Sequence, residues 1–365
     1  MHKLLKPSIY WLLLSAPLAL ILEETHAPAP LVFFSAALAI VPIASLIVLS
    51  TEHLASHLGP AAGGLLSATC GNLPELIIAV VALRAGLTDM VRASITGALL
   101  ANLLLAMGLA FLLGGIRHHV QEYNPAAGRT YGAMMLLAAL SITVPAGFRR
   151  VVGEQGIRYA EMLDVGVAIA FLAAYVLYLI FMLRTHRDFF TETAEENEHG
   201  AGAVWSAGKA GGVLLGASLA AAWMSEILVG AAEATGHALG MSPVFVGVVL
   251  LAVVGGAAES GSAVSMARRN KMGLSVGIVM GSCIQTALFV APVLVIASRL
   301  AGMKPFALNF TPGEILTLFA AVMIGLSAAG DGRANWFKGV QLLVFYLILA
   351  TMFYLVPPET GWQKP

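Results

Sequence analysis

Charge is scarce in this sequence. Asp, Glu, Lys and Arg make up only 11% of the 365 residues, and hydrophobic residues make up 59%. The mean hydropathy is +0.86. So little charge excludes an ordinary soluble globular protein and predicts an all-α polytopic membrane protein. The formal net charge is zero, so the composition gives no reason to expect nucleic acid as a partner.

Cysteine is also rare. The two cysteines, Cys70 and Cys283, lie in predicted membrane spans and have neither zinc-site nor redox spacing. They therefore predict no disulfide framework and no redox compartment. The nine histidines form no His-Glu-x-x-His or similar ligand pattern. No cofactor is expected.

Long apolar runs, by contrast, are abundant. Runs of about 20 residues, the length that crosses a bilayer as a helix, are separated by charged or Gly/Pro-rich breaks. They predict eleven transmembrane helices, one extra N-terminal span followed by two groups of five. The expected spans are 8–23, 31–51, 63–84, 93–116, 130–148, 161–184, 207–232, 243–267, 273–299, 311–329 and 335–356.

Two related groups with an odd number of spans must lie in the membrane with opposite orientation. This is the inverted-repeat plan of many secondary transporters. The expected parts are the extra helix (1–30), a first five-helix repeat (31–184), a weakly acidic cytoplasmic linker (185–206), a second five-helix repeat (207–356) and a C-terminal tail (357–365). A cleaved signal peptide is the less favoured interpretation of the N-terminus, because Lys3 and Lys6 precede its apolar run.

Lysine and arginine predict the orientation. Twelve of the 20 would lie on the side of the N-terminus and eight on the other side, so a cytoplasmic N-terminus is expected. The expected location is a prokaryotic inner membrane. The linker contains Glu192, Glu195, Glu196 and Glu198. A solvated acidic stretch is favoured over a cation-collecting vestibule for this group, since charge runs are usually solvated.

Two glutamates interrupt otherwise apolar spans. Glu75 follows Gly71-Asn72-Leu73-Pro74, and Glu259 lies three residues after Gly256. An unpaired charge at the centre of a span costs on the order of 3 kcal/mol, so both glutamates are expected to have a function. The two stretches also belong to an internal repeat, in which Gly71 and Glu75 recur 184 residues later as Gly255 and Glu259.

The breaks beside the glutamates predict a cation site lined by oxygen. Glycine weakens a helix and Pro74 has no N–H to donate, so carbonyl groups near residues 68–72 are expected to lack helical partners. Carbonyl and carboxylate oxygens suit a hard cation such as Ca²⁺. Burial also favours the protonated carboxyl group, so protons would compete with the cation. The expected ligands are Glu75, Glu259, Asn72, Gly71, Gly255 and Gly256, with Asn72 as either a ligand or a helix cap.

Other polar residues are candidates for a supporting role. Small residues around Gly97 and Gly281 are expected mainly to pack closely between helices. Each group is followed by an amide that could be a second ligand or could orient a carboxylate. A second duplicated pair of acids could line an access path to the site, and Glu226 is favoured over Glu52 because Glu52 lies near a span end. The supporting candidates are Asn102, Gln285, Ser260, Ser282, Glu52 and Glu226.

The residues around both glutamates resemble a known family. The stretch from Gly63 through Gly71-Asn-x-x-Glu75 resembles the first repeat of the calcium/proton exchangers in the calcium/cation antiporter superfamily. Gly255-x-Ala-Ala-Glu259 and Gly281-Ser-x-x-Gln285 resemble the second repeat, and Asp331-Gly-x-x-Asn335 also fits. The resemblance covers about residues 51–356.

This resemblance implies an eleven-span fold with inverted repeats that exchanges cytoplasmic calcium for protons by alternating access. It implies Glu75 and Glu259 as the central ligands for the cation and for protons. Calcium ions, protons and the lipid bilayer are the implied partners, and association into a homo-oligomer is left open. Gly256 stands where the family usually has asparagine, and Ser260 where it usually has histidine. Leu73-Pro74 instead resembles sodium/calcium exchangers of the same superfamily.

Alternatives follow from these departures. Sodium could replace the proton as the coupling ion, or another divalent cation could replace calcium. A passive cation channel is a more distant alternative, which would move ions only down their gradient. An intramembrane hydrolase built on Ser260, Ser262 or Ser282 would lack a histidine or lysine base in the same spans, so no enzyme activity is expected.

Overall fold

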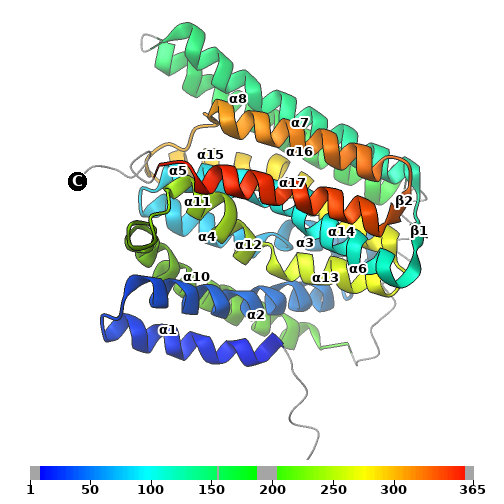
Figure 1. Cartoon of the computed structure of the whole chain (residues 1–365), viewed down its shortest axis with the longest axis horizontal. Helices are drawn as coiled ribbons and strands as arrows, with labels where there is room; N and C mark the ends of the chain where they lie inside the picture. The colour runs from blue at the N-terminus through cyan, green and yellow to red at the C-terminus, as the bar shows by residue number, and fades with distance from the viewer. Residues whose placement is uncertain (1–8, 154–155, 187–203, 358–365) are drawn as a thin grey trace, which may run out of the picture.

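The computed structural model describes residues 9–153, 156–186 and 204–357 (Figure 1). Most of the linker expected at 185–206, including its four glutamates, lies outside the described residues, as do Lys3 and Lys6. Within the described ranges the chain is almost entirely helical, as the apolar runs predict. The protein is an integral membrane protein by the length and composition of its helices.

Eight continuous helical stretches of the described residues are long and apolar enough to cross a membrane. Five of them are single α-helices, and the other three each contain a π-helical segment. They are α2 (Ala29–Ala55), α5 with η2 and α6 (Thr88–Leu100, Ala101–Ala106, Met107–His118), α7 (Pro125–Val152), α8 with η4 (Ile157–Ile180, Phe181–Thr185), α10 (Ala207–Leu239), α14 with η8 and α15 (Met272–Gln285, Thr286–Val290, Ala291–Leu300), α16 (Pro312–Ala329) and α17 (Trp336–Tyr354).

Two further stretches are bent pairs. One joins α3 (Gly59–Cys70) to α4 (Leu73–Arg84), and its described helices are bent by 42°. The other joins α11 (Pro243–Phe245), η7 (Val246–Leu251) and α12 (Ala252–Gly255) to α13 (Ala257–Arg268), with a bend of 56°. Counting each pair as one span gives up to ten spans.

The segment before α2 is shorter. It consists of η1 (Ile9–Leu14, 6 residues) and α1 (Ser15–Glu24, 10 residues). These two helices do not reach the length of the other spans, so the eleventh span stays a prediction. The bounds of the ten other expected spans agree with the observed helices to within a few residues at most ends.

The helices lie in three groups (Figure 1). Helices α1, α2 and α10 run side by side along one edge, and α2 and α10 form the most extensive helix pair. Helices α7, α8 and α16 lie at the opposite edge, where α7 packs against both α8 and α16. The two bent pairs lie between these edges, so both broken helices are inside the bundle.

A small antiparallel sheet closes one end of the bundle. Its strands are β1 (Val120–Glu122) and β2 (Arg333–Asn335), with Gln121 opposite Ala334. The strands lie at the right-hand end of Figure 1, where α6 and α13 end. The sheet therefore links a connection in the first half of the chain to one near its end.

Close backbone contact holds the centre of the bundle together. A Cβ atom at Gly97 would lie 2.1 Å from the carbonyl oxygen of Val248, so no larger residue fits between α5 and η7. The prediction that Gly97 is a close-packing position is confirmed. The same prediction is wrong for Gly281, because a Cβ atom there would have no neighbour within 4 Å.

Candidate functional site

Both glutamates lie at breaks between helices. Helix α3 ends at Cys70 and α4 begins at Leu73, which places Glu75 in the first turn of α4. In the same way Glu259 lies in the first turn of α13, just after the break at Gly256. A helix N-terminus favours negative charge, because its first N–H groups lack helical partners. The predicted breaks are therefore confirmed.

The two breaks meet inside the bundle. The Cβ position of Gly255 lies 3.1 Å from the Cγ atom of Glu75, so the glutamate side chain packs against the backbone of the other break. Glu75 and Glu259 are close enough to interact electrostatically. A Cβ atom at position 255 would press on the Glu75 side chain, which would then have to shift by a few tenths of an ångström.

Ser282 is the centre of a buried polar cluster. Its hydroxyl donates to Oε2 of Glu259 and accepts a hydrogen bond of 2.9 Å from Nδ2 of Asn102. Nδ2 of Asn72 donates to the carbonyl oxygen of Ser282 at 3.3 Å and to Oγ1 of Thr286 at 3.2 Å. Asn72, Asn102, Ser282 and Thr286 are all buried. The cluster thus joins residues that are far apart in the sequence.

The direction of these hydrogen bonds limits what Ser282 can do. An amide nitrogen only donates, so the bond from Asn102 occupies one acceptor position of the Ser282 oxygen. The single hydroxyl hydrogen is then left for an acceptor. Two acceptors are near, Oε2 of Glu259 and Oδ1 of Asn72, the latter 3.5 Å away.

Asn72 does not cap a helix with its side chain. It occupies the N-cap position of α4, but its side chain makes no capping hydrogen bond. The cap interpretation is therefore wrong, because the amide instead bridges to Ser282 and Thr286.

The expectation that carbonyl groups near 68–72 lack helical partners is wrong at Asn72. The carbonyl oxygen of Asn72 accepts from the N–H of Leu76 at 3.0 Å, as the first acceptor of α4. The carbonyl oxygen of Ala68 accepts from the hydroxyl of Tyr175 at 3.0 Å. At the other end of the break, Pro74 has no N–H to offer the carbonyl of Cys70. A side chain from α8 and the new helix thus satisfy part of this break.

Asn102 and Thr286 lie in corresponding π-helical segments. Asn102 belongs to η2 and Thr286 to η8, and the two positions are 184 residues apart, like Glu75 and Glu259. A π-helical turn holds an extra residue, so it redirects side chains relative to an α-helix, and such turns are frequent at functional sites. Sequence reasoning missed Thr286, although applying the same repeat to Asn102 would have identified it.

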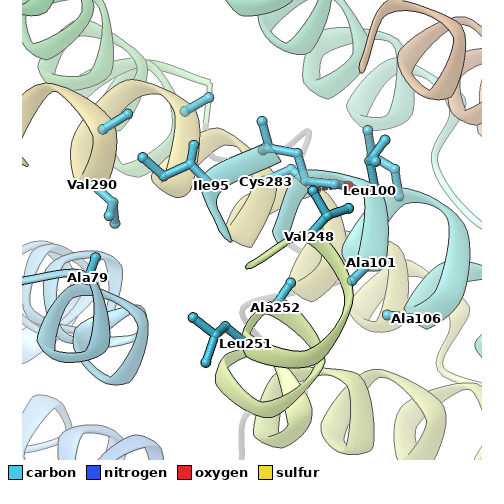
Figure 2. Packing of buried hydrophobic residues seen from close by; sticks show 14 of the residues in the cluster. Ala79, Ile95, Leu100, Ala101, Ala106, Val248, Leu251, Ala252, Cys283 and Val290 are labelled. Carbon is cyan, nitrogen blue, oxygen red and sulfur yellow. Dashed lines mark hydrogen bonds between the residues drawn. The ribbon is translucent and has the colours of Figure 1, made fainter. Parts of the chain in front are cut away.

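A small cavity adjoins Glu75. Its volume is about 20 Å³, enough for one water molecule or ion. The Oε2 atom of Glu75 is buried and has no hydrogen-bond partner among the described residues. Most lining residues are apolar, and Figure 2 labels Ala79, Ile95, Leu251, Ala252 and Val290 among them. Ser94 and Thr286 provide the other polar side chains.

Of the supporting candidates, Gln285 and Asn102 lie beside the two helix breaks, and Ser260 makes no bond to the cluster. Oε1 of Gln285 is 3.5 Å from the Cβ position of Gly71, and Oδ1 of Asn102 is 3.6 Å from that of Gly256. The side chain of Ser260 makes no hydrogen bond in the described part of the chain, so it stands outside the cluster.

The second pair of acids is not part of the cluster. Glu52 and Glu226 are exposed on the surface of the protein. An access path along them stays a prediction. No group of three or more His, Cys, Asp or Glu side chains that could hold a metal occurs within the ranges the structure describes. A cation held by Glu75 and Glu259 would therefore need neutral oxygen atoms as its other ligands.

Comparison with known proteins defines the class. A bundle of membrane helices with two broken helices and paired acids inside it is typical of secondary transporters. A model of the family described as sodium/calcium exchanger protein matches residues 28–184 and 209–355. The chain therefore belongs to the sodium/calcium exchanger protein family. This family consists of transporters rather than enzymes, which excludes the intramembrane hydrolase.

Two relatives are similar over almost their whole length. The chain is 38% identical to a protein of Aphanothece halophytica named Ca(2+)/H(+) antiporter, with 96% of this chain and 98% of that protein covered. It is also 38% identical to the Ca(2+)/H(+) antiporter ChaA of Bacillus subtilis, with 95% and 99% covered. The resemblance seen around the two glutamates is thereby confirmed.

Two solved structures share the fold. The structure of native YfkE matches with a TM-score of 0.82 at 34% identity, covering 96% of this chain and 100% of that chain. The H⁺/Ca²⁺ exchanger CAX matches with a TM-score of 0.70 at 16% identity, covering 95% and 91%. The second likeness is one of fold alone.

Proposed function

We propose that this protein is a secondary antiporter that exchanges cytoplasmic Ca²⁺ for protons. The observation that carries the proposal is the meeting of Glu75 and Glu259 at two helix breaks within one buried polar cluster. Its relatives named Ca(2+)/H(+) antiporter, at 38% identity over nearly their whole length, support the same ions.

The proposed cation site uses oxygen atoms from both halves of the chain. The carboxylates of Glu75 and Glu259 match the charge of a divalent cation, and Ca²⁺ prefers carboxylate and carbonyl oxygens. Oδ1 of Asn72 and backbone carbonyls of the breaks are the neutral ligands in this proposal. These carbonyls belong to Gly71, Gly255 and Gly256.

Exchange follows from the cost of leaving this site empty. Two ionised carboxylates facing each other in a buried site repel, so each conformational change favours a site loaded with either Ca²⁺ or protons. Ser282 can serve both states. It donates to an ionised Glu259, and it can accept from a protonated Glu259 while turning its own hydrogen toward Oδ1 of Asn72. The second arrangement would withdraw that oxygen from the cation.

The inverted-repeat plan is part of the proposal. The family model matches two separate segments, 28–184 and 209–355, and the breaks at Gly71 and Gly255 are 184 residues apart. We propose five-helix repeats at 31–184 and 207–356, an additional N-terminal span and a cytoplasmic linker at 185–206. The N-terminus would then lie in the cytoplasm of a prokaryotic inner membrane.

Purified protein in liposomes tests the ions directly. A Ca²⁺ gradient imposed in sodium-free buffer should drive protons in the opposite direction, against their own gradient. Added sodium should leave the rate unchanged. Calcium movement that requires sodium would favour sodium coupling, and flux only down gradients would indicate a channel. Replacing Ca²⁺ by Mn²⁺ or Mg²⁺ tests the other divalent cations.

A further inference from the structure

Gln121 connects the small sheet to the helix that carries Glu259. It is the one buried residue of β1, with 2% of its surface exposed. Its Nε2 atom donates to the carbonyl oxygen of Ala267 at 2.9 Å and to Oδ1 of Asn270 at 2.9 Å. Both acceptors lie at the end of α13. A strand in the first half of the chain thus binds the end of a helix in the second half.

Gln121 adds side-chain bonds to a helix end that the backbone also caps, because the carbonyl oxygen of Ala267 accepts from the N–H of Asn270 at 3.1 Å as well. The last four carbonyl groups of an α-helix have no partner within the helix. Backbone atoms satisfy part of this end, since the N–H of Lys271 bonds to the carbonyl of Met266 at 3.0 Å and Asn270 is left-handed with φ of 61°. Gln121 adds a side-chain donor to Ala267, and Nε2 of His118 lies 3.1 Å from the carbonyl oxygen of Arg268.

The helix opposite leaves room for this amide. A Cβ atom at Gly114 in α6 would lie 2.2 Å from Oε1 of Gln121 and 3.2 Å from Cβ of Ala267. The Oε1 atom is buried and has no hydrogen-bond partner among the described residues. Burying this oxygen without a hydrogen bond destabilises the folded state, and the two hydrogen bonds made by Nε2 must offset that cost.

The helix that carries Glu75 has no such cap. Helix α4 ends with backbone bonds, from Leu87 N–H to Ala82 and from Gly86 N–H to Leu83, both 3.0 Å. In the part of the chain that the structure describes, no side chain donates to its last carbonyl groups. The connection that corresponds to β1 in the second half, residues 301–311, instead bonds to the end of α15 through Ser298 and Arg299.

We infer that Gln121 is a positioning residue that holds the end of α13 and thereby sets the place of Glu259. The inference rests on the proposed function. Helix α13 has 12 residues, and Glu259 lies in its first turn. A continuous helix moves as one rod, so loosening its last turn lets its first turn shift within the cation site. Within the residues that the structure describes, the helix of Glu259 has this side-chain anchor and the helix of Glu75 does not.

The test removes the hydrogen-bond donor of Gln121 and keeps the shape of its side chain. Gln121→Glu places a carboxylate oxygen where Nε2 faces two acceptors. In the full-length protein in liposomes, we expect the apparent KM for Ca²⁺ to rise roughly tenfold, as expected for the loss of hydrogen bonds to buried acceptors. We expect the maximal rate to change less than about twofold. Hydrogen exchange in detergent without added Ca²⁺ should become faster for residues 257–271 and stay unchanged for α4.

Two further variants complete the design. Glu122→Gln changes the neighbouring exposed side chain of β1, which only pairs with Arg333 at 3.2 Å on the surface, and should leave KM and exchange unchanged. Asn270→Gly removes one of the two acceptors and tolerates the left-handed backbone. It should give a smaller rise in KM, and it replaces Gln121→Glu if that variant does not fold.

Wild-type KM and wild-type exchange of α13 in Gln121→Glu would overturn the inference. A fall in maximal rate with unchanged KM would also overturn it. If the unaltered protein moves no Ca²⁺, the proposed function fails. The exchange rates of α13 still decide separately whether Gln121 anchors the helix.

Discussion

The side-chain amide of Asn102 donates a hydrogen bond of 2.9 Å to the hydroxyl of Ser282, 180 residues later in the chain. Asn102 lies in η2 and Ser282 in α14, so the bond joins the two halves of the protein beside Glu259. It also occupies one acceptor position of Ser282, whose hydroxyl hydrogen is left for Glu259 or for Oδ1 of Asn72.

Ser282→Ala should therefore weaken the cation site. The substitution removes the donor to Glu259 and leaves the Asn102 amide without its acceptor. Hydrogen bonds to ionised groups contribute about 1.5–3 kcal/mol, so we expect the apparent affinity for Ca²⁺ to fall roughly 10- to 100-fold in a transport assay.

Two other substitutions of serine control this measurement. Ser282→Thr keeps the hydroxyl and should retain most of the affinity. Ser218→Ala removes a hydroxyl that bonds only to the carbonyl of Leu214 in its own helix, and it should have no effect. Wild-type affinity in Ser282→Ala would contradict the role given to Ser282.

Gly97 and Gly281 occupy corresponding positions of the repeat but should respond differently to substitution. A Cβ atom at Gly97 would collide with the backbone of Val248, whereas one at Gly281 meets nothing within 4 Å. Overpacking costs about 1–3 kcal/mol, so Gly97→Ala should lower the unfolding temperature in detergent. Gly281→Ala should leave the unfolding temperature unchanged or raise it slightly, since alanine favours a helix. Equal effects of the two variants would argue against the close contact of α5 with η7.

Asp164 should be important for stability. Its carboxylate is fully buried in α8, accepts a hydrogen bond from Nη2 of Arg149 and lies 3.9 Å from Arg299. Asp164→Ala leaves both arginines without their buried counter-charge, and breaking such a pair costs about 3–5 kcal/mol. The expected result is a clear fall in the unfolding temperature in detergent. Glu161→Gln, on the exposed side of the same helix, is the matched control, and an equal fall there would contradict this account.

The ionised carboxylate of Asp331 should stabilise the folded state at neutral pH and lose this effect at acid pH. Partial burial raises the pKa of Asp331, but the hydrogen bonds from Lys338 and from the N–H of Arg333 outweigh it and lower the pKa below 3.8. A carboxyl group with a lowered pKa stabilises the folded state above its unfolded-state pKa, and this contribution is lost as the pH falls through the folded-state pKa. The unfolding temperature of the unaltered protein should thus exceed that of Asp331→Asn at about pH 7, and the difference should shrink below about pH 4. A difference that does not change with pH would contradict this ionised pair.

The fold was largely predictable from two kinds of sequence signal. Apolar runs predicted the eight continuous membrane-length stretches and the two bent pairs of the described residues, because crossing a bilayer requires a minimum helix length. Glycine and proline beside Glu75 and Glu259 gave the two helix breaks, because these residues weaken the helical ladder locally. The first expected span, 8–23, corresponds to the helical stretch Ile9–Glu24, and its crossing of the membrane stays a prediction.

The polar cluster was less predictable, for physical reasons. The π-helical segments that contain Asn102 and Thr286 have no composition signal in the sequence. The acceptor of Asn72 comes from another helix, so its sequence neighbours suggested a cap that does not form. Gln121 is one polar residue in a short connection, and nothing near it in sequence indicates that it binds the end of α13.

The most direct test of the whole account is Ca²⁺ uptake into everted membrane vesicles, driven by an imposed pH gradient. The unaltered protein should accumulate Ca²⁺, whereas Glu75→Gln and Glu259→Gln, which keep the side-chain shape but remove the ionisable group, should each lose uptake almost completely. Uptake by both variants at the rate of the unaltered protein would contradict the claim that these two carboxyl groups carry the exchanged ions.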